Sequence, residues 1–405
     1  MGATDGDEAQ PGAGRTWPSR RVRVLVLIKG LGLGGAERLV VDLMANRDRD
    51  CFEYEVASVL ADHDDLAPAL EASGVPVHRL GAGGSTDLRW VARLRHLLVT
   101  GRFDVVHSHL PYAASFARLA VLSMAPGRRP ALVYTEHSLW DRAAILTRAL
   151  NRATVGLDRA LIVVSPAAME ALPPSLRAHA QVVVHGVDRA RMVALVERRG
   201  ALRDRLRHEI GDPGDVSVVA VTVANVRSEK GYDVWLAAAE RLAARQVPVH
   251  LVSVGTGPEL PALEAVRDEA GLAGRVDFLG LRSDALELMA GADLFVLPSH
   301  QEGMPVALME AMSLGLPVVA SRIGGVPDIV DSGIEGILVP PGDAAALAGA
   351  LEELAADVGR RQAMGRAASA RSAEFDVARS ARTIESVYRR VLGRPAPAAV
   401  EGTGA

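Results

Sequence analysis

The sequence predicts an α/β protein with two doubly wound, Rossmann-like domains that face a central cleft. Three observations carry this prediction. Short apolar runs rich in β-branched residues alternate with longer amphipathic runs, a pattern typical of parallel sheets with helices on both faces. The alternation occurs in two series, which an Arg- and Glu-rich stretch separates. The length of 405 residues suits two domains or slightly more.

The first series begins with Val22–Ile28, an almost continuous apolar run that predicts a parallel strand buried on both faces. A helix over residues 36–45 should follow, with Leu39, Val40 and Leu43 along one side. Further strands are expected at 54–60, 75–79, 104–107, 131–135 and 160–164, and further helices at 87–98 and 113–122.

The second series follows the Arg- and Glu-rich stretch, which runs from about residue 187 to 213 and predicts a linker with a helix. Strands are expected at 216–223, 249–254, 276–279, 294–297, 317–320 and 336–338, and two final helices at 343–354 and 372–391. We therefore divide the chain into a disordered tail (1–19), a first domain (20–187), a linker (188–215), a second domain (216–371), a final helix (372–393) and a second disordered tail (394–405).

The composition excludes several classes of protein. A hydrophobic fraction of 49% is too high for a disordered or fibrous chain, and a net charge of −4 argues against a nucleic-acid-binding protein. The single cysteine, Cys51, excludes an intramolecular disulfide and a cysteine-rich zinc site. The sequence has no secretory signal and no run of about 20 apolar residues, so we expect a cytoplasmic protein.

Only two of the 45 basic residues are lysines, and each lies in the turn after the first strand of a predicted domain. Lys29 precedes a turn in which Gly30, Gly32 and Gly35 match the dinucleotide fingerprint G-x-G-x-x-G. Such a turn lets a phosphate approach the following helix N-terminus. A tight turn that binds nothing is the alternative. A nicotinamide site would also need an acidic residue about 20 positions on, and the nearest, Asp62, lies further away.

The second domain carries charged residues at two of its turns. Arg227 and Lys230 lie three residues apart and could bind a diphosphate between them, although a solvated turn would have the same sequence. After the strand at 294–297 comes a glycine loop with Glu302, and a helix should begin at Pro305. Glu310 lies two turns into this apolar helix. A carboxylate there needs a partner if it is buried, or else belongs to a surface stripe.

These motifs resemble those of a known enzyme family. The segment Glu302-Gly303-Met304-Pro305-x4-Glu310 is similar to the E-x7-E signature of the retaining family 4 glycosyltransferases, which have the GT-B fold. The other motifs that resemble the family are Gly34-Gly35-Ala36-Glu37, His107-Ser108-His109, Thr135-Glu136-His137, Val164-Ser165, Gly186-Val187-Asp188, Lys230-Gly231, the segment 315–320 and Gly324-Gly325-Val326-Pro327. The matches run in order from about residue 20 to 340.

The resemblance implies an enzyme that moves a sugar from a UDP-, GDP- or ADP-sugar to a hydroxyl acceptor and retains the anomeric configuration. The second domain would hold the donor. The first would hold the acceptor, which could be a sugar, a glycolipid or a small molecule in envelope glycolipid, polysaccharide or glycoside synthesis. The final helix would cross back onto the first domain. No cofactor or metal is expected, and we interpret the acidic run at 62–65 as a solvated loop.

The resemblance also implies roles for individual residues. Glu302 would bind sugar hydroxyls, and Glu310 would accept hydrogen bonds from the ribose. The remaining assignments place Lys230 and Arg227 at the diphosphate, the backbone from Gly303 through Met304 and Pro305 to Val306 at the sugar and phosphate, Gly34 and Gly35 across the cleft, and His109 near the reacting carbon. Two positions depart from the family pattern: Asn225 stands where many members have the phosphate arginine, and Asp328 where many have Glu.

The two histidines of the His-Ser-His motif need separate interpretations. We expect them to alternate at a strand end and therefore to face opposite sides of the sheet. On that expectation only one ring can enter the cleft. The family pattern favours His109 there, which leaves His107 as a structural histidine.

The first domain also carries an excess of positive charge, with 11 arginines against 5 acidic residues between positions 80 and 160. Basic residues sit at helical spacing beside apolar ones, namely Arg89, Arg93 and His96 beside Trp90, Leu94, Leu97 and Leu98. This face could rest on an anionic membrane surface, and the alternative is a solvated face over a core stripe. Three other functions remain open: a nucleotide-sugar epimerase on the same fold, a nicotinamide-dependent oxidoreductase, and an inert nucleotide-sugar sensor.

Overall fold

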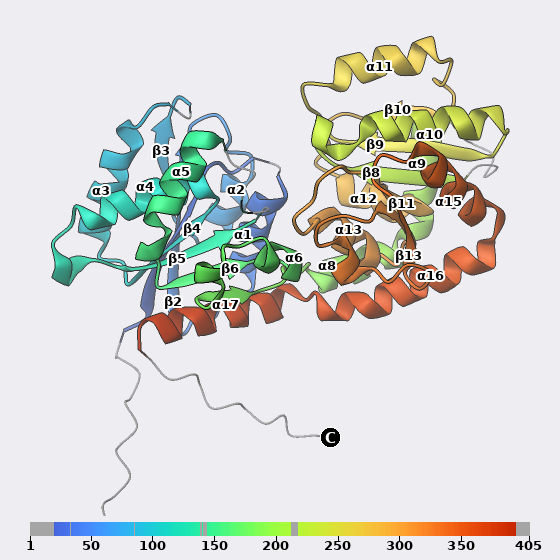
Figure 1. The fold of residues 1–405 in the computed structure, drawn as a ribbon. Helices are drawn as coiled ribbons and strands as arrows, with labels where there is room; N and C mark the ends of the chain where they lie inside the picture. The colour runs from blue at the N-terminus through green and yellow to red at the C-terminus, as the bar shows by residue number, and fades with distance from the viewer. Residues whose placement is uncertain are drawn as a thin grey trace, which may run out of the picture.

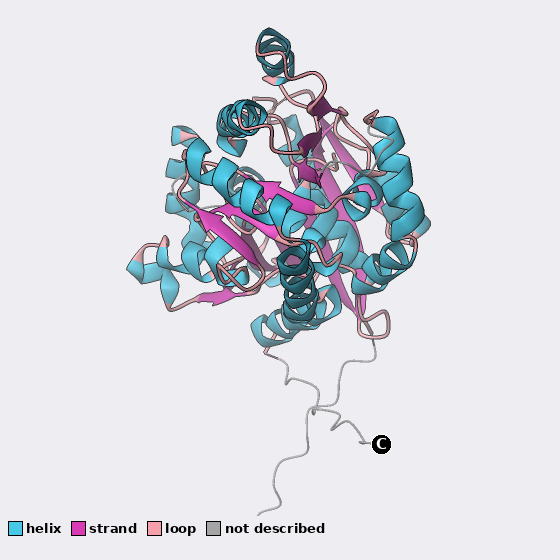
Figure 2. Ribbon diagram, turned by 90° about the vertical axis from the view of Figure 1, so that its right-hand side faces the viewer, coloured by secondary structure: helices cyan, strands magenta, loops and turns pink. Residues whose placement is uncertain are grey.

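The structure is a computed structural model that describes residues 20–32, 34–84, 86–137, 140, 144–211 and 218–393. It consists of two lobes, each built on a parallel β-sheet (Figure 1). Seen from the side, the strands lie between helices on both faces (Figure 2). The predicted α/β architecture with two doubly wound sheets is confirmed. The expected terminal tails, 1–19 and 394–405, lie outside the described residues.

The first sheet has seven strands in the order β3-β2-β1-β4-β5-β6-β7. Its strands are β1 Val22–Ile28, β2 Phe52–Leu60, β3 Val77–Ala82, β4 Val105–His109, β5 Ala131–Glu136, β6 Ala160–Val163 and β7 Ala180–Val182. Its helices are α1 Gly35–Ala45, α2 Ala67–Ala72, α3 Arg89–Gly101, α4 Pro111–Leu122, α5 Ile145–Thr154, α6 Pro166–Glu170 and α7 Pro174–Arg177. The strand order reverses between β1 and β4, which is where ligands bind in doubly wound sheets.

The second sheet has six strands in the equivalent order, β10-β9-β8-β11-β12-β13. Its strands are β8 Val218–Val223, β9 Val249–Val254, β10 Val276–Phe278, β11 Leu294–Leu297, β12 Val318–Ser321 and β13 Gly336–Val339. Its helices are α10 Tyr232–Ala244, α11 Leu260–Glu269, α12 Ala285–Gly291, α13 Val306–Ser313, α14 Val326–Ile329, α15 Ala344–Ala356 and α16 Val358–Arg371. The second reversal lies between β8 and β11, so the turns that carry Lys230 and Glu302 leave neighbouring strands.

The last helix, α17 Val377–Val391, returns to the first lobe, as predicted. Together with α16 it runs along the base of both lobes in Figure 1. Its residues Ala381, Ile384 and Tyr388 are buried in the same core cluster as β1. The two chain crossings between the lobes pair with each other, because the Val187 amide donates to the Phe375 carbonyl over 2.8 Å.

Two parts of the chain differ from the sequence prediction. The stretch expected as a linker with a helix forms two helices, α8 Arg189–Glu197 and α9 Arg199–Glu209, and their apolar residues join the core of the second sheet. Helix α16 was not predicted, because only Met364, Gly365 and Ala368 are buried along it and the apolar period is weak. Strand β7 was also missed, since its three residues are all half-buried.

The basic helix of the first domain, α3, packs its apolar side inward. Trp90, Leu94 and Leu98 are buried in the core, and Arg93 donates to the carbonyl oxygen of Gly81 over 3.0 Å. The stripe of apolar residues therefore belongs to the protein interior. Within the described ranges, no helix combines the length and the apolar character that crossing a membrane requires.

Candidate active site

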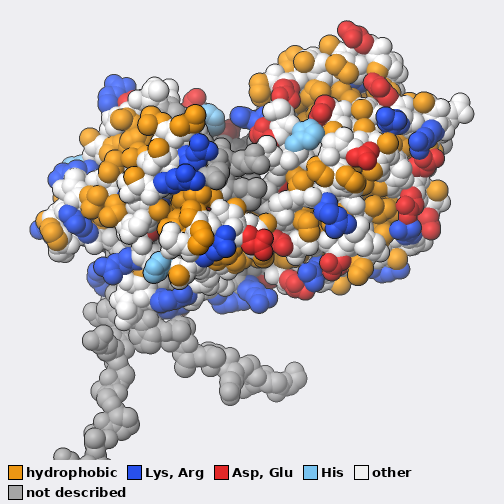
Figure 3. All heavy atoms as spheres, viewed as in Figure 1, with side chains coloured by type: hydrophobic (Ala, Val, Ile, Leu, Met, Phe, Trp, Pro, Cys, Tyr) orange, Lys and Arg blue, Asp and Glu red, His pale blue; other side chains and the backbone are white. Residues whose placement is uncertain are grey.

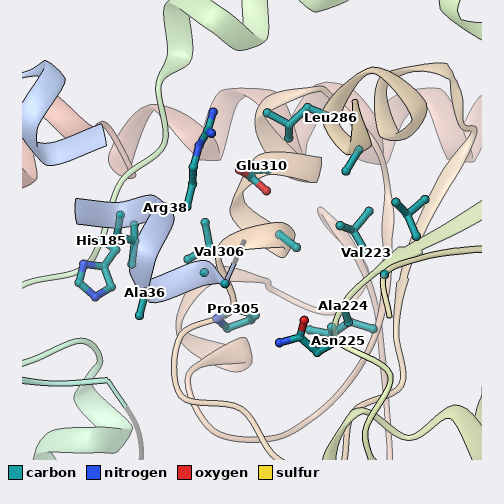
Figure 4. A pocket seen from close by; sticks show the side chains of 18 of the residues that line it. Ala36, Arg38, His185, Val223, Ala224, Asn225, Leu286, Pro305, Val306 and Glu310 are labelled. Carbon is teal, nitrogen blue, oxygen red and sulfur yellow. The ribbon is translucent and has the colours of Figure 1, made fainter. Parts of the chain in front are cut away.

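A cavity of about 370 Å³ lies between the two lobes, at the carboxyl ends of their strands. Both sheets contribute to its lining. From the first lobe come Gly34, Gly35 and other residues at the start of α1. From the second lobe come Pro305 and Val306 at the start of α13, which Figure 4 shows together with Ala36 of α1. A Cβ atom added to Gly35 would lie 3.5 Å from Val306 Cγ2, so the lobes almost touch here. Two helix N-termini thus open into one cavity, and such termini attract anions.

The turn with Lys230 and the loop with Glu302 meet in this cavity. Lys230 Nζ donates a hydrogen bond to Glu302 Oε1 over 2.8 Å, and the Ser299 hydroxyl donates to the same oxygen over 2.7 Å. Gly231, with φ of 69°, allows this approach, because a Cβ atom there would collide with the carbonyl oxygen of Pro298. The side chain of Glu302 is only 7% exposed. The carboxylate is therefore held in place by one cation and one hydroxyl.

The glycines of the segment 324–327 support the Glu302 loop from behind. The Gly325 amide donates to the Gly303 carbonyl over 2.8 Å. Gly324 has φ of 49°, and a Cβ atom there would collide with the Glu302 carbonyl oxygen. The motif at Glu302 and the motif at Gly324, which both resemble the family, thus pack directly against each other.

Glu310 lies in the second turn of α13 and lines the cavity beside residues of α1. Arg38 and Glu310 come from different lobes and lie close together in Figure 4. The pKa of Glu310 is raised to about 8, mainly by burial and also by the Asp42 carboxylate, while the Arg38 guanidinium opposes the rise. Asp42 is itself shifted, since burial raises its pKa to about 6. A carboxyl group that is protonated at neutral pH therefore faces the cavity.

The prediction that His107 and His109 face opposite sides of the sheet is wrong. Their ring centroids are 4.4 Å apart, because residues two positions apart in a strand point to the same face. His107 is the structural member of the pair. Its Nδ1 atom lies 2.6 Å from the Tyr388 hydroxyl and its Nε2 atom 2.7 Å from Thr135 Oγ1, so both nitrogens have protein partners.

His109 is buried, with 3% exposure, and lies behind the cavity wall. The histidines that line the cavity are His137 and His185. His109 Nδ1 is 2.8 Å from His137 Nε2, and the rings of His137 and His185 stack with centroids 5.0 Å apart. His137 belongs to the Thr-Glu-His motif, which resembles the family but predicts no individual role for this residue, whereas the sequence around His185 marks it only as the residue before Gly186.

The cations that line the cavity differ in part from those predicted. Lys230 lines it, but Arg227 is exposed and is absent from the lining. Asn225, at the position where the family often has arginine, does line it. Three further cavity cations, Arg38, Arg191 and Arg282, were not predicted, because nothing in their local sequence distinguishes them from other arginines.

The predicted site residues can now be placed together. Those that line the cavity are Gly34, Gly35, Lys230, Glu302, Met304, Pro305, Val306 and Glu310, and those that do not are Gly303, His109 and Arg227. Lys29, the other lysine, lies outside this lining, with its amine 5.6 Å from the centre of the Tyr112 ring. Among the described residues, no group of three or more His, Cys, Asp or Glu side chains is arranged to hold a metal ion.

Comparison with known proteins places this chain in an enzyme family. Residues 33–191 match the family described as Glycosyltransferase Family 4, and residues 217–357 match Glycosyl transferases group 1. EpsF of Bacillus subtilis is 27% identical over 335 residues, which cover 78% of this chain and 83% of EpsF. The D-inositol 3-phosphate glycosyltransferase of Mycobacterium tuberculosis is 32% identical over 312 residues, or 72% of this chain and 63% of that enzyme.

Solved structures agree with this placement at the level of the fold. Anabaena HepE in complex with UDP-glucose superposes with a TM-score of 0.78 at 23% identity, covering 91% of this chain and 100% of HepE. The sucrose-phosphate synthase of Thermosynechococcus elongatus gives a TM-score of 0.75 at 22% identity, covering 92% and 99% of the two chains. The fold is the GT-B fold of two facing α/β domains. The chain therefore belongs to the group 1, family 4 glycosyltransferases.

Proposed function

We propose that this glycosyltransferase moves a sugar from a nucleoside-diphosphate sugar to a hydroxyl acceptor with retention of configuration, and without a metal or cofactor. One observation supports this most strongly. The Lys230–Glu302 pair, the N-terminus of α13 and the Glu310 carboxyl group share a single cavity between the lobes. This set offers a cation and amides for a diphosphate and carboxyl groups for hydroxyls.

Each part of the donor has a partner in the proposal. Glu302 accepts hydrogen bonds from the sugar, and Glu310 from the ribose. Lys230 and the N-termini of α1 and α13 stabilise the diphosphate. Several such groups are needed because negative charge builds up on the diphosphate as its bond to the sugar breaks. Arg227 remains a predicted contributor, and the lining arginines Arg38, Arg191 and Arg282 are further candidates for this role.

The chemistry needs no protein nucleophile. The acceptor hydroxyl attacks the sugar carbon from the face that the diphosphate leaves, and the departing phosphate takes the hydroxyl proton. Glu302 is hydrogen bonded to Lys230 and Ser299, so it acts as a positioning group rather than as one of the two carboxylates of a glycosidase. His109 is assigned to the region of the reacting carbon.

A donor panel tests the proposal. UDP-, GDP- and ADP-sugars are compared by thermal shift and by slow donor hydrolysis, because HepE was solved with UDP-glucose and a plant starch synthase of similar fold with ADP. We expect one nucleotide class to stabilise the protein and Glu302→Ala to abolish turnover while the fold is kept. Unchanged turnover in Glu302→Ala would contradict the site assignment.

The same panel separates the other functions. An epimerase would convert the nucleotide sugar into its epimer without an acceptor, and a sensor would bind a donor without hydrolysing it. Stabilisation by NAD but by no nucleotide sugar would favour an oxidoreductase and would contradict the transferase proposal.

The acceptor side is proposed to meet an anionic membrane. Exposed apolar residues lie on α4 and α5, namely Leu119, Leu122, Ile145 and Leu146, the last two 78% and 83% exposed. Figure 3 shows hydrophobic side chains beside basic ones on this lobe. A lipid-linked acceptor would suit such a face. Co-sedimentation with anionic vesicles at low salt should occur and should weaken in Ile145→Glu, and no binding by the unaltered protein would contradict the idea.

A further inference from the structure

A second cavity, of about 490 Å³, lies at the other edge of the second sheet and is called the α9–α16 cavity below. Asp293 and Pro317 line it, and these residues directly precede β11 and β12, so it lies at the amino ends of the strands. The cavity between the lobes lies at the carboxyl ends, where ligands usually bind in doubly wound sheets. Among the described residues, none lines both cavities.

The α9–α16 cavity is bounded by elements that pack directly on each other. Helix α9 and the end of α8 form one wall, α16 forms another, and the turn after α13 forms a third. A Cβ atom added to Gly365 of α16 would lie 2.3 Å from the carbonyl oxygen of Gly315, so α16 rests directly on that turn. Arg199 of α9 holds the same turn, because its Nη2 atom donates to the carbonyl oxygen of Leu314.

Positive charge predominates in the lining of this cavity. Its four arginines are Arg199, Arg203, Arg361 and Arg366. Among the described lining residues, Asp293 is the one with an acidic side chain. Asp293 forms an ion pair with Arg203, and its Oδ2 atom also accepts hydrogen bonds from Arg207 over 3.0 Å and from the Val219 amide over 2.9 Å. The single carboxylate is therefore already shared by two arginines.

The other three lining arginines have no carboxylate partner within the part of the chain that the structure describes. Arg361 donates through Nη1 to the carbonyl oxygens of Leu354 and Ala355, over 2.6 and 2.9 Å. Arg199 likewise donates to a carbonyl oxygen. The side chain of Arg366 is exposed and has no hydrogen bond or ion pair to another described residue. Carbonyl groups carry only partial charges, so the charge of these three arginines is not balanced.

Arg199 shows this imbalance most clearly. Its side chain is half-buried, and its Nε atom is buried with no hydrogen-bond partner among the described residues. Burial lowers the pKa of Arg199, the Asp293 carboxylate opposes this shift, and the Arg203 charge adds to it. Burying a cation is costly when no opposite charge is paired with it. An anion in the cavity would supply that opposite charge.

The lining combines groups that suit a small organic phosphate. Guanidinium groups bind phosphate oxygens through paired N–H donors, and Ser369 and Gln362 add a hydroxyl and an amide. Apolar side chains line the same cavity, namely those of Val196, Leu316 and Val358. An inorganic ion would leave them uncovered, whereas a carbon skeleton would contact them. The volume also falls within the range of about 300–1,000 Å³ that is usual for sites of small molecules.

We propose that the α9–α16 cavity binds a small organic phosphate, with the phosphate group among Arg199, Arg361 and Arg366 and the carbon skeleton against Val196 and Val358. The site is separate from the cavity between the lobes, so this inference goes beyond the proposed function. Arg366 is the residue to alter in a test, because it lines the site while its side chain holds no other described residue in place.

Calorimetric titration with glycerol 3-phosphate in a phosphate-free buffer tests the site. We expect a dissociation constant of about 1 mM or lower, weaker binding of inorganic phosphate and no binding of glycerol. Arg366→Gln should weaken the binding of glycerol 3-phosphate about tenfold, the loss expected for roughly one charge-assisted hydrogen bond. The matched control is Arg382→Gln, an exposed arginine of α17 outside this lining, which should leave the affinity unchanged.

Three results of these titrations would overturn the proposal. The first is a lack of binding to the unaltered protein, and the second is an Arg366→Gln variant that binds as tightly as the unaltered protein. The third is inorganic phosphate that binds as tightly as glycerol 3-phosphate, because the carbon skeleton would then make no contact.

Methyl NMR locates the bound glycerol 3-phosphate, since this anion can also enter the cavity between the lobes. It should shift the methyl signals of Val196, Leu316 and Val358, and these shifts should persist in Lys230→Met. Shifts confined to Val306, which lines the cavity between the lobes, would overturn the proposal. These measurements use no nucleotide sugar and no acceptor. Failure to transfer any sugar would therefore contradict the proposed function alone, and failure to bind glycerol 3-phosphate would contradict this site alone.

Discussion

Lys230 Nζ and Glu302 Oε1 are joined by a 2.8 Å hydrogen bond between two motifs that lie 72 residues apart. The pair is largely buried, with side-chain exposures of 22% and 7%. In the proposed function Glu302 binds the sugar and Lys230 binds the diphosphate, and their contact means that each side chain orients the other. Removing either partner should therefore affect both stability and donor binding.

We expect Lys230→Met to lower the free energy of unfolding by about 1–3 kcal/mol, because it leaves the Glu302 carboxylate buried without its cation. The Lys230→Met/Glu302→Gln double variant should lose less than the sum of the single variants, since the two residues are in contact. Urea unfolding measures these differences. Additive losses would contradict the coupling.

Lys230→Met also tests which cation binds the diphosphate. Lys230→Met should weaken nucleotide binding by at least about tenfold, the effect of roughly one charge-assisted hydrogen bond. Arg227→Ala is the comparison and should weaken binding less, because the side chain of this second predicted cation is exposed and lies outside the cavity lining. Equal losses in calorimetric titrations would show that Arg227 reaches the diphosphate after all.

Much of this site could be predicted because it depends on local patterns. The strands β1, β9 and β11 begin and end at the residues predicted from their mainly apolar, β-branched sequences, since buried parallel strands need such runs. Once the strands are placed, the doubly wound topology brings the turns after β8 and β11 to neighbouring positions. The meeting of Lys230 with Glu302 follows from that topology.

Other parts could not be predicted because they depend on how the lobes face each other. Arg38 approaches Glu310 only across the interface, and Arg191 and Arg282 resemble the many other arginines in sequence. His185 enters the site from the segment before a chain crossing, where no motif marks a functional residue. The error at His107 and His109 was of a different kind, because the strand period of two already required a shared face.

The raised pKa of Glu310 predicts a pH dependence of stability. Its folded-state pKa of about 8 lies above the ordinary value of 4.5. Between these two pH values the folded protein keeps a proton that the unfolded chain has lost, so Glu310 lowers stability as the pH rises. We expect Glu310→Gln to remove this decline, and denaturant unfolding from pH 5 to 8 measures it.

The control for that experiment is Glu269→Gln, an exposed residue at the end of α11. This variant should change the free energy of unfolding little and should leave its decline with pH as steep as in the unaltered protein. A Glu310→Gln variant whose stability falls with pH as steeply as that of the unaltered protein would show that Glu310 is ionised in the folded state. The ribose assignment would then concern a carboxylate that is already charged before the nucleotide binds.

Tyr388 ties the returning helix α17 to the first sheet through His107. Its hydroxyl is 2.6 Å from His107 Nδ1, and both residues are fully buried. Tyr388→Phe leaves that nitrogen without a partner and should cost about 1–3 kcal/mol of unfolding free energy. Because His107 does not line the cavity, nucleotide affinity should be unchanged. A variant that keeps its stability but loses affinity would contradict the structural role of His107.

Substitution of Gly231 should disturb the backbone strongly, because this residue combines a positive φ with a close approach to another part of the backbone. Its φ is 69°, and a Cβ atom would collide with the Pro298 carbonyl oxygen. Gly342 has a similar φ of 78°, but a Cβ atom there would have nothing within 4 Å. Gly342→Ala should therefore cost only the backbone strain, about 1–2 kcal/mol.

Gly231→Ala should cost more than that control, about 2–4 kcal/mol, since the turn and the end of β11 must move apart. That movement separates Lys230 from Glu302, so nucleotide affinity should fall in Gly231→Ala and stay unchanged in Gly342→Ala. Thermal unfolding with and without nucleotide compares the two variants. If both lose the same stability and keep the same affinity, the close approach at Pro298 does not hold the donor site together, and the Lys230–Glu302 contact must be maintained by the loop at Gly324 and Gly325 alone.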